Sequence, residues 1–125
     1  MWWELAVNPR NVTAYYASPP DLRGVEVSSV CIHRWVELLI ELPVFPDKPS
    51  RRWHPSCNAA TANLRFFGFR NVQLDNWGFT NKGDINLKKV GNTIEFSFQG
   101  ESNRLFGCAD CFDVEKITGY CKEVK

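Results

Sequence analysis

The sequence between residues 85 and 98 reads INLKKVGNTIEFSF and alternates apolar with polar residues on both sides of a Gly-Asn pair. Successive side chains of a β-strand point to opposite faces, so this period of two predicts two strands that each bury one face. Glycine adopts positive φ angles at little cost, and Gly91-Asn92 therefore predicts a tight turn between the strands. This segment is expected to form an antiparallel β-hairpin.

The same period recurs along the chain. Residues 36–42 place aliphatic side chains at every second position, with Glu37 and Glu41 between them. Strand-forming residues also predict strands at 25–32, 62–69, 72–76, 103–109 and 112–121. Short turns between such runs are typical of antiparallel sheets. The sequence thus predicts a mainly β fold, an antiparallel sandwich or barrel-like sheet of about eight strands.

A short helix is expected near the N-terminus. Asn8 can cap its first backbone N–H groups, and Pro9 has the φ angle of a first helical position. This helix is expected to continue through Val12 and Tyr16 and to end before Ser18-Pro19-Pro20. A long proline-rich loop is expected at 43–58, with Trp53 holding it against the body of the protein.

Length and composition predict one globular domain, residues 1–125. The chain has 44% hydrophobic and 23% charged residues, which are ordinary values for a globular protein. Its formal net charge of +1 offers little attraction to nucleic acid or to an anionic membrane, and neither is an expected partner. The N-terminus lacks the basic and apolar regions of a signal peptide, so we expect the protein in the cytoplasm.

The five cysteines are expected to be free thiols, because their number is odd and the chain carries no export signal. A zinc-binding β module is the alternative. Cys108 and Cys111 have a spacing that allows two thiolates to bind one Zn²⁺, and His54 and Cys57 can supply two more ligands. However, Cys108 and Cys111 lie in a region read as β-strand, where their side chains point to opposite faces unless a turn intervenes. No metal and no cofactor are therefore expected.

The aromatic residues have two interpretations. Phe66, Phe96, Phe98 and Trp35 are expected in the core, because large apolar side chains fill β interiors. The alternative is a ligand-binding module in which Trp2, Trp3, Trp53 and Trp77 form an exposed platform, and we expect them instead to be scattered or buried. No arrangement typical of a nucleophilic or acid–base catalyst stands out, so an enzyme is not expected.

Short motifs follow one another in a fixed order along nearly the whole chain. They are Asn8-Pro9, Tyr15-Tyr16, Pro20-Asp21-Leu22, Glu41-Leu42-Pro43, Pro46-Asp47-Lys48-Pro49, Arg52-Trp53, Asn63-Leu64-Arg65-Phe66 and Asn76-Trp77. Their order resembles that of the immunity protein 50 family. The resemblance implies a cytoplasmic bacterial protein that is encoded beside a polymorphic toxin and neutralises it. The cognate toxin domain is then the expected partner, and the free protein is expected to be a monomer or a weak dimer.

Two surface patches are candidates for contact with that partner. One is the proline-rich loop with Asp47, Arg51, Arg52 and His54, and the other is the strand end with Asp75, Asn76 and Phe79. Binding residues gather on loops that a rigid scaffold positions, and both patches combine polar groups with a nearby aromatic side chain. A turn in which Asn76 adopts a special backbone conformation is the alternative for the second patch.

Overall fold

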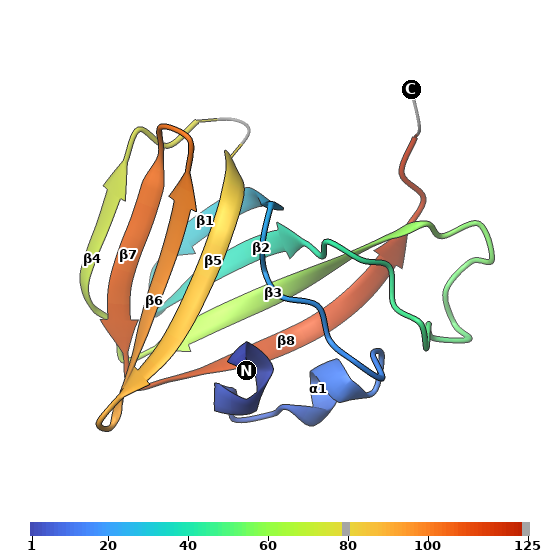
Figure 1. The fold of residues 1–125 in the computed structure, drawn as a ribbon, viewed down its shortest axis with the longest axis horizontal. Coiled ribbons are helices and arrows are strands. Elements are labelled where there is room, and N and C mark those ends of the chain that lie inside the picture. Colours follow the sequence, from blue (N-terminus) through green and yellow to red (C-terminus); the bar gives the residue numbers. More distant parts are fainter. Residues whose placement is uncertain (79–80, 124–125) are drawn as a thin grey trace.

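A computed structural model describes residues 1–78 and 81–123. The chain starts with two short helical turns, and strands follow from residue 25 onward (Figure 1). The elements are η1 (Trp2–Leu5), α1 (Arg10–Thr13), β1 (Val25–Ile32), β2 (Trp35–Glu41), β3 (Ala59–Phe67), β4 (Arg70–Asp75), β5 (Asn81–Val90), β6 (Thr93–Gly100), β7 (Arg104–Ala109) and β8 (Cys111–Tyr120). Within the described ranges, no helix is long and apolar enough to cross a membrane.

The mainly β prediction is confirmed. Eight strands form one antiparallel sheet in the order β4-β7-β6-β5-β1-β2-β3-β8. The hairpin of residues 85–98 pairs Ile85 with Phe98 and Leu87 with Phe96, and Gly91 has a φ of 61° in its turn. The sheet has β4 and β8 at its two ends and does not close into a barrel.

The sheet folds over on itself in two halves, β4-β7-β6-β5 and β1-β2-β3-β8 (Figure 1). A narrow seam of three residue pairs joins β1 to β5. At the opposite side β3 leads into β4 and β7 into β8 around a corner, where Gly68 has a φ of 67°. Arg70 holds this corner, because its Nη1 donates to Asp110 Oδ1 at 2.8 Å and to the Gly68 carbonyl at 3.0 Å.

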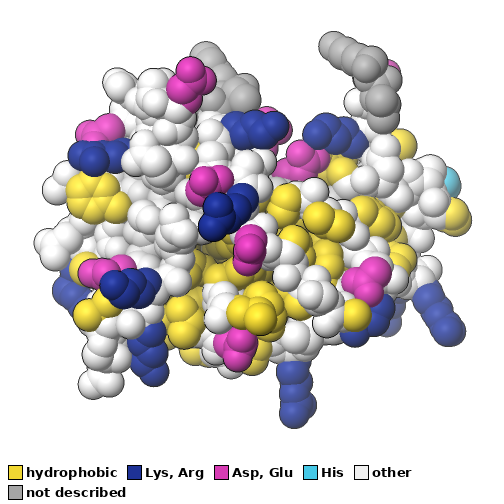
Figure 2. Space-filling model, in the orientation of Figure 1, with side chains coloured by type: hydrophobic (Ala, Val, Ile, Leu, Met, Phe, Trp, Pro, Cys, Tyr) yellow, Lys and Arg dark blue, Asp and Glu magenta, His cyan; other side chains and the backbone are white. Residues whose placement is uncertain are grey.

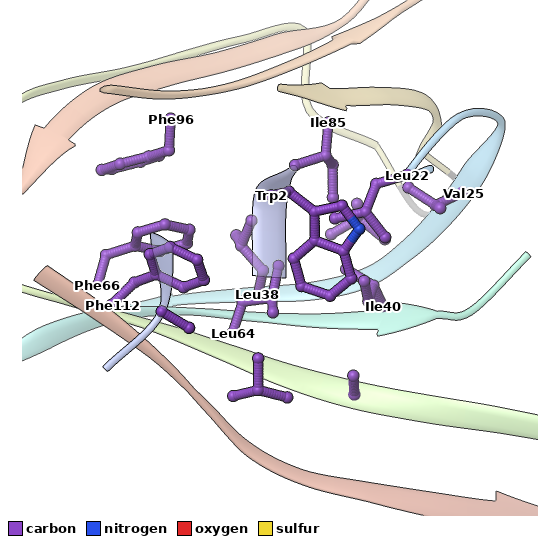
Figure 3. Packing of buried hydrophobic residues seen from close by; sticks show 14 of the residues in the cluster. Trp2, Leu22, Val25, Leu38, Ile40, Leu64, Phe66, Ile85, Phe96 and Phe112 are labelled. Carbon is purple, nitrogen blue, oxygen red and sulfur yellow. The ribbon is translucent and has the colours of Figure 1, made fainter. Parts of the chain in front are cut away.

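The core lies between the two halves. Phe96 reaches down from β6 and meets Phe66 and Phe112, which come from β3 and β8 (Figure 3). The ring of Phe66 lies 4.2 Å from that of Phe96 and 5.5 Å from that of Phe112, and all three rings are buried. These stacked rings hold the two halves of the sheet together, since apolar area removed from water stabilises the fold.

The N-terminal segment covers an open side of this core. Trp2 of η1 is buried beside Leu38 and Ile85, and its indole Nε1 donates to the Pro20 carbonyl at 2.9 Å (Figure 3). Asn8 does not cap α1, and this corrects its expected role. Its side chain pairs with the backbone of Val114 through two hydrogen bonds, of 2.8 Å and 3.0 Å. Asn8 thus satisfies part of the free edge of β8, and the α-helix is shorter than expected, ending at Thr13.

The loop at 43–58 packs against the N-terminal segment, and Trp53 holds it there as expected. The Trp53 ring stacks on Tyr15 at 5.3 Å and lies over Gly119, where an added Cβ would come within 2.5 Å of the ring. Hydrophobic side chains gather where this loop and the N-terminal segment cover the sheet (Figure 2). Of the other tryptophans of the alternative platform, Trp2 and Trp3 lie in η1 and Trp77 packs on Phe98. None of the four is fully exposed. They form no exposed row, which confirms the expectation.

Candidate binding surface

The four residues of the alternative zinc site do not come together. His54 and Cys57 lie in the loop before β3, whereas Cys111 pairs with Phe67 at the far end of that strand. The eight residue steps from Ala59 to Phe67 correspond to roughly 26 Å of extended chain. Among the residues that the structure describes, no group of three or more His, Cys, Asp or Glu side chains can hold a metal ion, and all five cysteines are free.

The loop patch divides into structural and free side chains. The Asp47 carboxylate accepts the Ala17 N–H at 3.1 Å and 3.3 Å and thereby ties the loop to the N-terminal segment. His54 Nδ1 contacts the Ser56 hydroxyl at 2.6 Å and accepts its backbone N–H at 3.1 Å. Arg51 and Arg52 are exposed, and within the described ranges their guanidinium groups form no hydrogen bond or ion pair. These two cations are available to a partner.

The second patch lies at the opposite end of the molecule, beyond β4 (Figure 1). Asp75 is engaged by Arg104, whose Nε lies 2.8 Å from Asp75 Oδ2. Asn76 has a φ of 53° and donates to the Ser102 carbonyl at 3.1 Å, so it forms the turn that was the alternative interpretation. Phe79 lies outside the described residues.

A third surface, on the outer face of β2, β3 and β8, was not expected from the sequence. Val36, Leu38 and Ile40 point into the core, so the residues between them point outward. Trp35 is one of these and lies half-buried on the outer face, which corrects its expected place in the core. The reason is its register, because it shares the face of Glu37 and Glu41 rather than that of Val36.

Strand pairing brings side chains from three strands together around Trp35. Trp35 lies opposite Phe67, and Arg65 lies between Glu37 and Asp113. The guanidinium carbon of Arg65 is 5.6 Å from the centre of the Trp35 ring and 5.4 Å from that of Phe67. These distances are typical of cation–π contacts, which draw the three side chains into one arrangement.

Two carboxylates complete this arrangement, which we name the Trp35 cluster: Trp35, Glu37, Asn63, Arg65, Phe67 and Asp113. Asp113 accepts from Arg65 Nε at 2.8 Å and from Nη2 at 2.6 Å, a bidentate pair that raises the pKa of Arg65. Glu37 accepts from Trp35 Nε1 at 3.1 Å and from Asn63 Nδ2 at 3.2 Å. Charged and aromatic groups are thus held in place on neighbouring strands, an arrangement suited to recognising another molecule.

The other end of this face carries a second hydrogen-bonded group. The Tyr120 hydroxyl donates to Glu41 Oε1, and Lys122 Nζ lies 2.9 Å from Glu41 Oε2. Burial acts to raise the pKa of Glu41, but the hydrogen bonds from Tyr120 and Lys122 outweigh it and leave the pKa lowered. Burial, together with the bond to the Glu41 carboxylate, raises the pKa of Tyr120 to about 12.

This raised pKa predicts a loss of stability at high pH. A tyrosine whose pKa rises from 10.0 in the unfolded chain to about 12 in the fold stabilises the fold fully below pH 10. That contribution disappears as the pH rises through about 12, because the folded protein then ionises Tyr120 as well. We expect Tyr120→Phe to make the decline of the unfolding free energy over this range less steep. Urea titrations at a series of pH values measure it, and an unchanged slope would contradict the assignment.

The sequence contains one indication of the Trp35 cluster, the alternation of inward and outward residues along its strands. Arg65 and Phe67 alternate with Leu64 and Phe66, as Trp35 and Glu37 alternate with Val36 and Leu38. An aromatic or an arginine on the polar phase of a strand indicates an outward side chain and a candidate contact residue. The alternation does not predict which strands pair, and the pairing of β3 with β8 is what places Asp113 beside Arg65.

Comparison with known proteins adds one match. The model of a family described as Immunity protein 50 matches residues 8–120, a range that includes all eight strands and the whole Trp35 cluster. Searches among curated proteins and among solved structures found no significant match.

Proposed function

The chain belongs to the Immunity protein 50 family, and from this membership we propose that it binds a cognate polymorphic toxin and neutralises it by a stoichiometric protein–protein interaction. The match along residues 8–120 is the observation that carries the proposal. We further propose that the protein acts in the bacterial cytoplasm, that the toxin domain is encoded beside it, and that inhibition follows from occupying the toxin rather than from catalysis.

The fold suits such a role physically. Tight binding requires that few side chains lose freedom on association, so a surface that is already ordered binds with a smaller entropic cost. The outer face of β2, β3 and β8 is ordered in this way, because ion pairs and hydrogen bonds fix its charged groups. The free protein is proposed to be a monomer or a weak dimer, in which this face stays accessible.

The two patches expected from the sequence are both proposed as contact sites, and the loop at 43–58 is the stronger candidate. A standard interface covers about 800 Å² of each partner, roughly a tenth of the 7676 Å² of accessible surface here. Because the loop at 43–58 and the turn after β4 lie at opposite ends of the molecule, one such interface cannot be centred on both. Arg51 and Arg52 are the stronger candidates, since His54, Asp75 and Asn76 already form hydrogen bonds or an ion pair within the protein.

Co-expression tests the proposed function. The probe is the toxin domain of the secreted protein encoded next to this chain, expressed in a host that it kills. We expect growth to be restored by this chain, and the two purified proteins to form a complex of one chain each in size-exclusion chromatography with light scattering. An unrelated toxin domain serves as the control. Absence of both protection and complex would contradict the proposed function.

A further inference from the structure

We propose that the Trp35 cluster is the centre of the toxin-binding surface and that the toxin presents a lysine or arginine to Glu37. This inference rests on the proposed function and identifies the part of the protein that carries it. Three observations support it: the uncompensated charge of Glu37, the half-buried aromatic rings beside it, and the fixed positions of both.

The charge argument begins with how each carboxylate is engaged. Arg65 directs two of its nitrogens to Asp113, so this cation and this carboxylate neutralise each other. Glu37 accepts only from the indole of Trp35 and the amide of Asn63, which carry no charge. In the described part of the chain, Glu37 is in no ion pair. Its negative charge is held in a fixed position without a cation bound to it.

Other acidic groups strengthen the field at this position. Glu115 lies near Arg65 and raises its pKa together with Asp113 and Glu37. Three carboxylates thus act on one arginine here, although the whole chain carries a formal net charge of +1. Glu115 is followed by Lys116 in the bulged part of β8, so the argument rests on Glu37 rather than on Glu115. A cationic side chain of a partner matches this charge.

The aromatic rings supply the apolar part of the contact. Trp35 and Phe67 are half-buried on the outer face, with ring centres 5.6 Å apart. Tryptophan and arginine are over-represented among the residues that contribute most to binding energies at protein interfaces. Covering these two rings completes their removal from water, which favours association.

Most of the cluster lies on interior strands of the sheet. β2 pairs with β1 and β3, and β3 pairs with β2 and β8, so both strands are hydrogen-bonded along two edges. The Arg65 and Asp113 side chains are 24% and 14% exposed. A similar group on the other half of the sheet, with Arg104 lying 5.1 Å from the Phe106 ring and pairing with Asp75, is far more open, at 52% and 51% for the ion pair. Asp75 and Asp113 both lie on end strands, β4 and β8, so the two groups differ in exposure and not in their distance from the sheet edge.

This second group provides matched controls. Phe67→Ala is compared with Phe106→Ala, because each removes an outward, half-buried phenyl ring beside an arginine. Glu37→Gln is compared with Glu95→Gln, because each neutralises an outward carboxylate on a strand without changing its shape. Circular dichroism and thermal unfolding establish that each variant is folded. The probe is the purified toxin domain encoded beside this chain, and calorimetry measures its dissociation constant at low and high salt.

We expect Phe67→Ala to weaken binding at least about 30-fold, as removal of a central anchor does. Glu37→Gln is expected to weaken binding about 10-fold and to reduce its salt dependence, because a charge pair is lost. Phe106→Ala and Glu95→Gln are expected to change the dissociation constant less than about 3-fold.

The outcomes separate this inference from the function on which it rests. If the unaltered protein binds and protects, but Phe67→Ala and Glu37→Gln bind the toxin domain as tightly as it does, the Trp35 cluster is not the binding surface. The proposed function then stands. Losses confined to Phe106→Ala and Glu95→Gln would overturn the inference in favour of the other half of the sheet. If the unaltered protein neither binds nor protects, the proposed function fails and this inference fails with it.

Discussion

Phe66→Ala is expected to lower the free energy of unfolding by about 3–5 kcal/mol, the usual cost of removing a fully buried phenyl ring. Phe66 is completely buried and stacks on Phe96 from the opposite half of the sheet and on Phe112 from the neighbouring strand. Its removal leaves a cavity between two rigid layers that cannot move together easily, because the corner at Gly68 and the seam between β1 and β5 fix their spacing.

Phe67→Ala is the control for this prediction, since it deletes the same ring one residue later. Phe67 points outward, where its ring contacts Trp35 and Arg65, and its loss opens no cavity in the core. We expect it to cost about 1 kcal/mol of stability while it weakens binding of the toxin domain. Urea denaturation followed by circular dichroism measures the free energy of unfolding of Phe66→Ala and of Phe67→Ala. Equal losses for the two variants would contradict the assignment of Phe66 to the core and Phe67 to the outer face.

The strands could be predicted from the sequence because their signal is local. In the hairpin of residues 85–98 the apolar positions, the Gly91 turn and the direction of each side chain all follow from neighbouring residues. The alternation in β2 likewise predicts which residues enter the core, and Val36, Leu38 and Ile40 do so. The size of Trp35 favours the core, whereas its position in that alternation indicates the outer face, and the structure follows the alternation.

What could not be predicted depends on residues far apart in the chain. Asn8 has the side chain of a helix cap, yet it bonds to Val114, 106 residues away, because the edge of β8 needs partners for its backbone groups. The Trp35 cluster needs Arg65 and Asp113 to meet across β3 and β8, and their 48-residue separation leaves no local trace. The candidate site is therefore a product of strand pairing, whereas the two patches expected from the sequence are single loops.

The N-terminal pair Trp2-Trp3 combines a buried and a partly buried tryptophan, and the buried one is expected to contribute strongly to stability. Trp2 is 8% exposed and lies between the two halves of the sheet, whereas Trp3 is only partly buried. We expect Trp2→Ala to lower the free energy of unfolding by about 3–5 kcal/mol, because it removes the side chain that covers an open side of the core. Trp3→Ala is the matched control, with an expected cost of about 1 kcal/mol.

Trp2→Phe separates the two contributions of this residue. Phenylalanine keeps most of the apolar bulk but cannot donate to the Pro20 carbonyl, which Trp2 Nε1 reaches at 2.9 Å. Loss of this partly buried hydrogen bond is expected to cost about 1–2 kcal/mol, so the variant should fall between the unaltered protein and Trp2→Ala in urea denaturation. If Trp2→Ala proved no less stable than Trp3→Ala, the N-terminal turn would not be part of the folded core, and the two halves of the sheet would have to be held together by the Phe66 stack and the strand pairing alone.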